Sequence, residues 1–141
     1  KEIAKVFGKK FIDTDDVVVE KRKESISDIF EKYGEGEFRK EERLAIEELS
    51  KANGLVIATG GGAVLDENNV RALRRNGVIL FLDRSLENLV ATADRQLSKD
   101  KEKLKNLFEK RYDVYKSCAD AVIPAAGEIA DVVEIIIGDL L

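Results

Sequence analysis

The sequence predicts an α/β fold in which a parallel sheet lies between two layers of helices. Short segments of continuous apolar residues alternate with longer segments whose apolar residues recur at helical spacing. The apolar segments 55–58 and 78–82 contain no charged residue, which is typical of parallel strands that are covered on both faces. A chain of 141 residues is close to the size of one domain, so we expect a single domain over residues 1–141.

The first half of the chain opens inside a helix, because apolar residues at helical spacing stop at Gly8, a residue suited to a helix end. Ser25, followed three residues later by Asp28, resembles a capping box and predicts a helix start. Gly34 and Gly36 separate that helix from a longer one. The predicted elements are helices over residues 1–7, 16–23, 25–33 and 37–52 and strands over residues 11–13 and 55–58.

In the second half, Asp66 and Ser85 are suited to cap helices and Gly77 is suited to end one. The segment 78–82 is the clearest strand of the chain, whereas the charged segment 94–100 lacks apolar periodicity and predicts a mobile loop. The predicted elements are helices over residues 66–76, 85–93, 101–118 and 128–141 and strands over residues 78–82 and 121–123.

The composition excludes several classes of chemistry. There is no His and only one Cys, Cys118, which excludes His-based triads, the usual zinc sites and an internal disulfide. The 24 basic and 28 acidic side chains nearly cancel, which argues against a nucleic-acid partner. The apolar runs fall short of the ~20 residues that span a bilayer, so we expect a cytoplasmic protein with no membrane contact. Chemistry must therefore depend on carboxylates, Arg, Lys, hydroxyls and backbone amides.

In parallel sheets of this kind, ligands bind beyond the carboxyl ends of the strands. Asp13 and Asp15 stand at such an end. If the segment is extended, the two side chains share a face and can serve a magnesium ion or accept a hydroxyl proton. The alternative is a turn in which an Asp caps the next helix.

Gly60, Gly61 and Gly62 directly follow a predicted buried strand. Glycines let another molecule approach the backbone closely, so that amide N–H groups can bind its oxygens. The alternative is a flexible or tightly packed loop. The segment is not a Walker phosphate loop, because no Gly-Lys-Ser/Thr follows it.

Three arginines are further candidates: Arg39 after Phe38, Arg95 in the charged loop and Arg111 in the helix 101–118. A guanidinium group can hold a carboxylate or phosphate through two hydrogen bonds. Taken singly, each arginine is more typical of a solvated surface charge. Combined with an acidic strand end and a glycine run, they predict a site for a small anionic ligand.

Together these residues occur in an order that closely resembles the shikimate kinases. The resemblance covers nearly the whole chain. It rests on Phe11-Ile12-Asp13-Thr14-Asp15, Ser25-Ile26-Ser27-Asp28-Ile29-Phe30, Gly34-Glu35-Gly36-Glu37-Phe38-Arg39, Thr59-Gly60-Gly61-Gly62-Ala63-Val64, Arg95-Gln96-Leu97 and Arg111-Tyr112-Asp113-Val114-Tyr115.

The resemblance implies a P-loop kinase fold of the nucleoside monophosphate kinase type. It also implies magnesium-dependent transfer of the ATP γ-phosphoryl group to the 3-hydroxyl of shikimate, in aromatic amino acid biosynthesis. It places the substrate-binding region at about residues 15–52 and a lid at about residues 94–100. It also implies that the protein is a monomer.

The resemblance also implies roles for single residues. Asp15 would hold the substrate hydroxyls and accept a proton, and Asp13 would lie near the magnesium ion. Arg39 and Arg111 would bind the shikimate carboxylate. The amides of Gly60, Gly61 and Gly62 would line the same pocket, and Arg95 would neutralise charge on the transferring group.

The sequence also departs from the family pattern. The Walker A loop is absent, and we expect it, with the central first strand of the sheet, to precede Lys1. Without that strand, a gap is expected between the remaining strands. Short internal gaps and the lack of Met suggest that a few internal residues are also missing. Ala91 and Gln96 replace an adenine-contacting Arg and a lid Pro, so nucleotide affinity is expected to differ.

Two other functions remain open from the sequence. The chain could be a catalytically inactive kinase-like domain that binds shikimate or a partner protein, which would account for the missing loop. It could also be a related small-molecule kinase such as gluconate kinase, although the Asp13 to Asp15 tip, Phe38-Arg39 and the glycine run favour shikimate.

Overall fold

The computed structural model describes residues 1–84 and 101–140. Within it the chain divides into two compact units, Lys1–Val78 and Ile79–Leu141. The predicted helix at 85–93 and the predicted lid lie outside the described residues. Whether residues 1–141 act as one domain stays a prediction.

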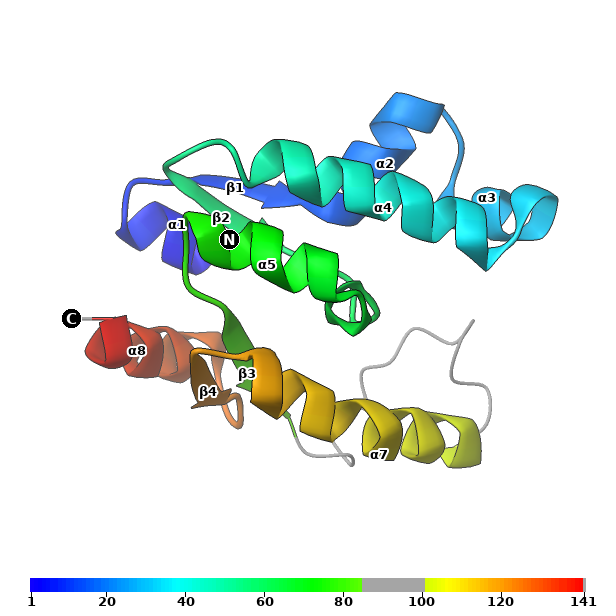
Figure 1. Ribbon diagram of the computed structural model, residues 1–141. Helices are drawn as coiled ribbons and strands as arrows, with labels where there is room; N and C mark the ends of the chain where they lie inside the picture. The colour runs from blue at the N-terminus through cyan, green and yellow to red at the C-terminus, as the bar shows by residue number, and fades with distance from the viewer. Residues whose placement is uncertain (85–100, 141) are drawn as a thin grey trace. The chain divides into compact units, whose positions relative to one another are not determined.

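The first unit contains two parallel strands surrounded by helices. Strand β1 (Lys10–Asp13) pairs with β2 (Leu55–Ala58), with Asp13 opposite Ala58. In Figure 1, α4 and α5 of this unit lie side by side, and residues of the two helices are in contact. The helical elements are α1 (Glu2–Val6), α2 (Thr14–Arg22), α3 (Ile26–Tyr33), α4 (Glu35–Leu49), the short 3-10 helix η1 (Ala63–Leu65) and α5 (Glu67–Arg75).

Local sequence signals account for most helix boundaries in this unit. The Ser25 hydroxyl accepts a hydrogen bond from the Asp28 amide and begins α3, and the Asp66 carboxylate accepts one from the Asn68 amide and begins α5. Gly8 takes a positive φ of 59° just after α1, a conformation that favours glycine. The predictions for these three positions are therefore confirmed.

Two small apolar cores fix α4, the helix that carries Arg39. One core packs α2, α3 and α4 together through Val18, Ile29, Phe38 and Ala45. The other packs α4 against η1 and α5 through Ile46, Ala63 and Ala72. Truncating a buried aromatic such as Phe38 typically costs about 3 to 5 kcal/mol, so these cores determine where the polar residues of α4 lie.

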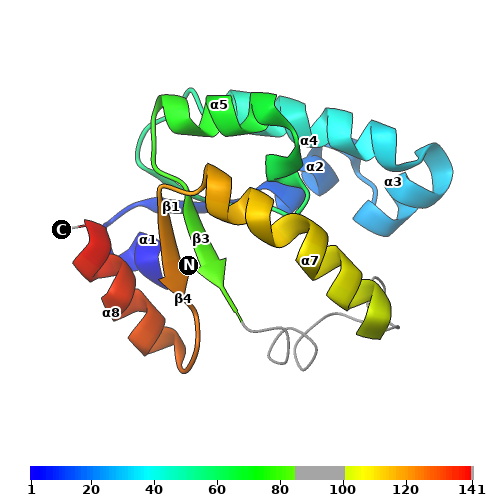
Figure 2. The ribbon, with the colours of Figure 1, turned by 60° about the horizontal axis from the view of Figure 1, so that its bottom comes forward.

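The second unit contains the parallel strands β3 (Leu80–Asp83) and β4 (Ala121–Pro124) and the helices α7 (Lys101–Cys118) and α8 (Ile129–Leu140). Figure 2 shows β3 and β4 side by side, with α8 next to β4. Phe81 on β3 packs against the rings of Tyr112 and Tyr115 on α7, at centroid distances of 5.7 and 5.2 Å. The Tyr112 hydroxyl donates a hydrogen bond to the Asp83 carboxylate at 2.7 Å, so α7 is joined to β3 by both apolar and polar contacts.

The α/β class and the parallel pairing agree with the sequence prediction, but several details differ. Helix α4 begins at Glu35, so that Gly36 lies inside it, and β3 begins at Leu80 instead of residue 78. Within the described residues the strands form two separate two-stranded sheets. All four residues of β2 are half-buried rather than buried. In a two-stranded sheet, each strand has one edge without a neighbouring strand to cover it. The helix α2 begins at Thr14 instead of residue 16.

Candidate active site

The carboxyl ends of β1 and β2 meet at one edge of their sheet. Because Asp13 is opposite Ala58 in the parallel register, the residues that follow each strand start from neighbouring positions. Asp15 follows β1, and the glycine run follows β2. The sheet therefore brings together the first two predicted site segments.

Asp15 lies in the first turn of α2, not in an extended segment. Asp13 is the N-cap of this helix, and its Oδ1 accepts a hydrogen bond from the Asp15 amide at 2.9 Å. The prediction that the two carboxylates share a face through strand alternation is therefore wrong. The alternative, in which an Asp caps the next helix, describes Asp13.

The Asp15 carboxyl group is partly buried and has a raised pKa. Its Oδ1 is buried and has no hydrogen-bond partner within the described residues. Burial raises the pKa of Asp15, and the negative charges of Asp13 and Asp16 raise it further, whereas Arg39 opposes the shift. A carboxyl group in this state accepts a proton more readily than an ordinary Asp.

Arg39 is held in place by two carboxylates of its own helix. Its Nη1 lies 2.9 Å from Glu42 Oε1, and its Nη2 lies 3.3 Å from Glu35 Oε1. Glu42 is only 1% exposed, so the ion pair with Arg39 compensates part of the cost of burying its charge. The guanidinium group is thus directed toward the site while part of it remains open to solvent.

The glycine run packs directly on these side chains. A Cβ atom at Gly60 would lie 3.6 Å from Asp15 Oδ1 and 3.7 Å from Glu42 Oε2. A Cβ atom at Gly62 would collide with the Arg39 guanidinium group. At Gly62 the absence of a side chain therefore lets the loop backbone approach the Arg39 guanidinium group. This describes the tightly packed loop given as the alternative, and binding of a ligand by the glycine amides stays a prediction.

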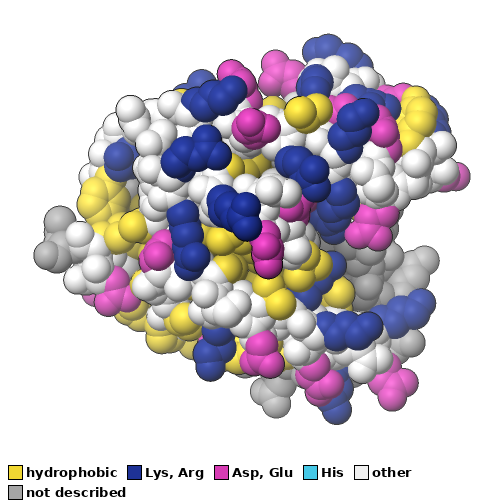
Figure 3. All heavy atoms as spheres, viewed as in Figure 1, with side chains coloured by type: hydrophobic (Ala, Val, Ile, Leu, Met, Phe, Trp, Pro, Cys, Tyr) yellow, Lys and Arg dark blue, Asp and Glu magenta, His cyan; other side chains and the backbone are white. Residues whose placement is uncertain are grey.

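A cavity of about 540 Å³ opens beside this cluster and is lined by Arg39, Glu42 and Gly62, among others. Arg43 and Asn69, on α4 and α5, line both this cavity and a second one between the two helices. In Figure 3, Lys and Arg side chains gather over α4 and α5. The cavity lining also includes the acidic side chains of Glu42, Asp66 and Glu67, so the cavity offers both basic and acidic groups to a ligand.

Ion pairs on the opposite side of α4 fix it to α2, the helix that carries Asp15. Glu41 is buried and binds Lys21 Nζ at 2.8 Å and Arg22 Nη1 at 3.2 Å. Arg22 Nη1 also lies 2.9 Å from Glu37 Oε1. These contacts hold the two helices that supply Asp15 and Arg39 in one arrangement.

The roles of the remaining predicted site residues stay predictions. Arg111 lies half-buried on α7 in the second unit, and Arg95, Ala91 and Gln96 lie outside the described residues. Within residues 1–84 and 101–140, no group of three or more His, Cys, Asp or Glu side chains could hold a metal ion.

Glu42 was not among the site residues predicted from the sequence. The signal was present, because Glu42 follows Arg39 by three residues and residues at this spacing are neighbours on a helix. Its importance depends on burial against the glycine run, which the spacing does not reveal.

A shikimate kinase family model matches residues 1–140. The chain belongs to the shikimate kinase family. The shikimate kinase of Clostridium botulinum (strain Eklund 17B / Type B) is 38% identical over 135 residues, which cover 93% of this chain and 81% of that protein. That of Caldicellulosiruptor saccharolyticus is 44% identical over 114 residues, which cover 76% of this chain and 66% of that protein.

Solved structures of shikimate kinases are similar to this chain. The enzyme from Acinetobacter baumannii in complex with shikimate has a TM-score of 0.91 and 29% identity, covering 98% of this chain and 82% of the other. The enzyme from Aquifex aeolicus has a TM-score of 0.86 and 30% identity, covering 98% of this chain and 84% of the other. The predicted P-loop kinase fold is thereby confirmed.

Membership of the shikimate kinase family makes the chain an ATP-dependent kinase, a transferase of aromatic amino acid biosynthesis. The comparisons give no support to the catalytically inactive alternative. No helix in the described parts of the chain is long and apolar enough to cross a membrane.

Proposed function

We propose that the chain transfers the γ-phosphoryl group of ATP to the 3-hydroxyl of shikimate and gives shikimate 3-phosphate and ADP. The observation that carries this proposal is the convergence of a proton-accepting carboxyl group, a guanidinium group and a glycine backbone at one sheet edge. A hydroxylated carboxylate such as shikimate needs these three partners. The Acinetobacter baumannii relative, whose structure contains shikimate, supports the choice of acceptor.

Asp15 is assigned the role of general base. The acceptor hydroxyl gives its proton to the Asp15 carboxylate, and its oxygen forms a bond to the γ-phosphorus. The bond between that phosphorus and the β,γ-bridging oxygen breaks, and ADP leaves. The raised pKa of Asp15 and its buried Oδ1 without a hydrogen-bond partner among the described residues both suit a hydroxyl donor.

Arg39 and the glycine amides are assigned to the substrate carboxylate and its neighbouring hydroxyls. Arg39 is prepositioned by Glu35 and Glu42, which lowers the conformational entropy lost when a ligand binds. We assign Arg111 a second contact with the carboxylate and Arg95 the neutralisation of charge on the transferring group. Phosphoryl transfer depends mainly on such positioning and electrostatics.

Magnesium is proposed as the metal of the reaction, held by Asp13 together with the phosphates of ATP. The fit rests on a carboxylate oxygen, the ligand type that Mg²⁺ prefers, since Mg²⁺ commonly binds through one or two carboxylates and substrate phosphates. The Oδ1 of Asp13 accepts the Asp15 amide, which leaves Oδ2 for this role. When bound, the ion neutralises charge on the phosphates.

We further propose that the protein acts as a monomer in the cytoplasm, with shikimate and ATP as its small-molecule partners and without nucleic acid or membrane contacts. The net charge of −4 favours neither polyanion binding nor self-association. Sedimentation at enzyme concentrations used for assays measures the oligomeric state.

The proposal is tested by an ATP-dependent phosphorylation assay on the full-length protein with shikimate and gluconate as acceptors. We expect turnover with shikimate alone, and loss of about 10² to 10⁴ in kcat for Asp15→Asn, the range typical of a general base. Glu20→Gln is the control, because Glu20 lies on the same helix, is exposed and is not among the charges that shift the pKa of Asp15. Near-normal turnover by Asp15→Asn removes the base role, and preference for gluconate refutes the assigned acceptor.

A further inference from the structure

A second arginine of α4 joins this helix to the far end of the glycine loop. Arg43 follows Arg39 by one helical turn. Its Nη2 lies 2.6 Å and its Nε 2.8 Å from Asp66 Oδ2. Both nitrogens of one guanidinium edge therefore bind the same carboxylate oxygen.

Asp66 has two structural roles at once. While Oδ2 binds Arg43, Oδ1 accepts the Asn68 amide at 2.9 Å and caps α5. Burial opposes ionisation, but the Asn68 amide and Arg43 together hold the pKa of Asp66 below its ordinary value. The carboxylate is thus charged at neutral pH and fixed to both α4 and α5.

The glycine loop spans the distance between β2 and Asp66. Pairing with β1 fixes one end of the loop at Ala58, and the Arg43–Asp66 contact fixes the other end to α4. Asn69, which is 1% exposed, donates a hydrogen bond from Nδ2 to the Ala63 carbonyl at 2.9 Å. The backbone near Gly62 is therefore anchored just beyond the point where it packs on Arg39.

We propose that Arg43 and Asp66 form a positioning pair that keeps the Gly62 backbone against the Arg39 guanidinium group and so sets the affinity for the substrate carboxylate. Both residues line the cavity beside the site, but the proposal assigns neither of them a contact with the substrate. The proposal rests on the proposed function, because it assigns the carboxylate to Arg39 and the glycine amides. It predicts an effect on the acceptor, not on ATP.

The experiment compares Arg43→Gln, Asp66→Asn and the double variant by steady-state kinetics and by calorimetric titration with shikimate. Asn retains the helix cap, so Asp66→Asn removes the charge and keeps α5 capped. Arg43 is 54% exposed, and such partly exposed pairs contribute modestly. We expect the KM and Kd for shikimate to rise about threefold to fivefold, with kcat and the KM for ATP within twofold of wild type.

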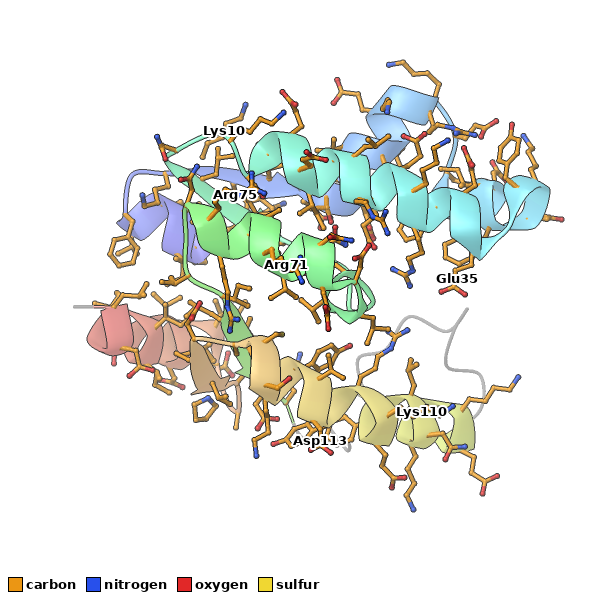
Figure 4. All side chains as sticks on the ribbon, in the orientation of Figure 1. Lys10, Glu35, Arg71, Arg75, Lys110 and Asp113 are labelled. Carbon is orange, nitrogen blue, oxygen red and sulfur yellow. The ribbon has the colours of Figure 1, made fainter. Side chains whose placement is uncertain are left out.

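Two further variants separate positioning from general stability. Arg43→Lys should recover part of the affinity, because it retains the charge. Arg71→Gln is the matched control. Arg71 lies on α5, one of the two helices joined by the Arg43–Asp66 contact (Figure 4). Its ion pair with Glu67 is exposed and long, at 3.7 Å. Arg71→Gln removes the same charge and should leave shikimate affinity unchanged.

A positioning pair also requires non-additivity, so the double variant should lose no more affinity than Arg43→Gln alone. Equal effects of Arg43→Gln and Arg71→Gln on the shikimate KM, or additive losses in the double variant, overturn the proposal. A lower melting temperature with an unchanged shikimate KM also overturns it. If neither Arg43→Gln nor Arg39→Gln changes shikimate binding, the proposed function itself fails. If only Arg39→Gln weakens shikimate binding, the positioning pair alone is refuted.

Discussion

Replacing Gly62 by Ala should weaken substrate binding without unfolding the protein. The φ and ψ angles of Gly62 are −87° and −8°, which Ala adopts freely. The new Cβ would collide with the Arg39 guanidinium group, which must move although it is paired with Glu35 and the buried Glu42. The substitution therefore displaces the functional group while the backbone stays in place.

The size of the effect follows from the contact that is lost. A charge-assisted hydrogen bond contributes about 1.5 to 3 kcal/mol, which corresponds to roughly a 10- to 150-fold rise in the Kd for shikimate. The free energy of unfolding should also fall, because displacing Arg39 weakens its ion pair with the buried Glu42. The gain of about 0.4 to 1 kcal/mol from the lower entropy of the unfolded chain offsets only part of that loss.

The assay is calorimetric titration with shikimate together with urea unfolding. Gly36→Ala is the matched control, since a Cβ atom at Gly36 meets no atom within 4 Å and Ala is the better helix former. This control should bind shikimate normally. Unchanged affinity in Gly62→Ala would show that Arg39 does not need its observed place beside the loop.

Three other predictions concern charge. Asp15→Asn should be more stable than wild type at neutral pH. The pKa of Asp15 is raised in the folded state, so the wild type loses stability as the pH rises from the ordinary Asp value through that raised pKa. Unfolding curves at pH 3 and pH 7 should therefore show the gain in stability only at pH 7. Glu41→Gln should lose about 1 to 2 kcal/mol of stability, measured by urea unfolding at neutral pH. The hydrogen bond from Lys21 and the charge of Arg22 lower the pKa of Glu41 despite its burial. The loss should therefore fade as the pH falls below about 4.3, the ordinary pKa of Glu. Arg111→Ala should raise the KM for shikimate at least tenfold in the coupled assay, if the loss of a carboxylate contact costs about 2 kcal/mol or more, while Lys110→Ala, at a neighbouring exposed position on α7 (Figure 4), should not.

Most elements of the fold were predictable because local chemistry determines them. Ser25 and Asp66 begin helices where a side-chain acceptor was expected, and α7 spans the predicted residues 101–118. The start of α2 was missed because Asp13 caps the helix directly at the end of β1. Apolar composition alone cannot show where an extended segment ends and a helix begins.

The candidate site was predictable only where a strand end fixes position. Asp13 lies opposite Ala58 in the strand register, so Asp15 and the glycine loop start from neighbouring positions. The contacts of Glu42 and Arg43 depend on how α4 packs against the loop and against α5, and two apolar cores determine that packing. The residue spacing along α4 predicts which side chains share a face of the helix, but not which other elements that face contacts.

The central claim is that Asp15, Arg39 and the glycine loop bind one molecule of shikimate. Amide and arginine-side-chain NMR spectra of the full-length protein, recorded during a titration with shikimate, test it most directly. The account predicts that the largest changes fall on Gly60, Gly61, Gly62 and the Arg39 Nε group and saturate with a single affinity. Saturable changes that leave these four resonances in place would contradict it.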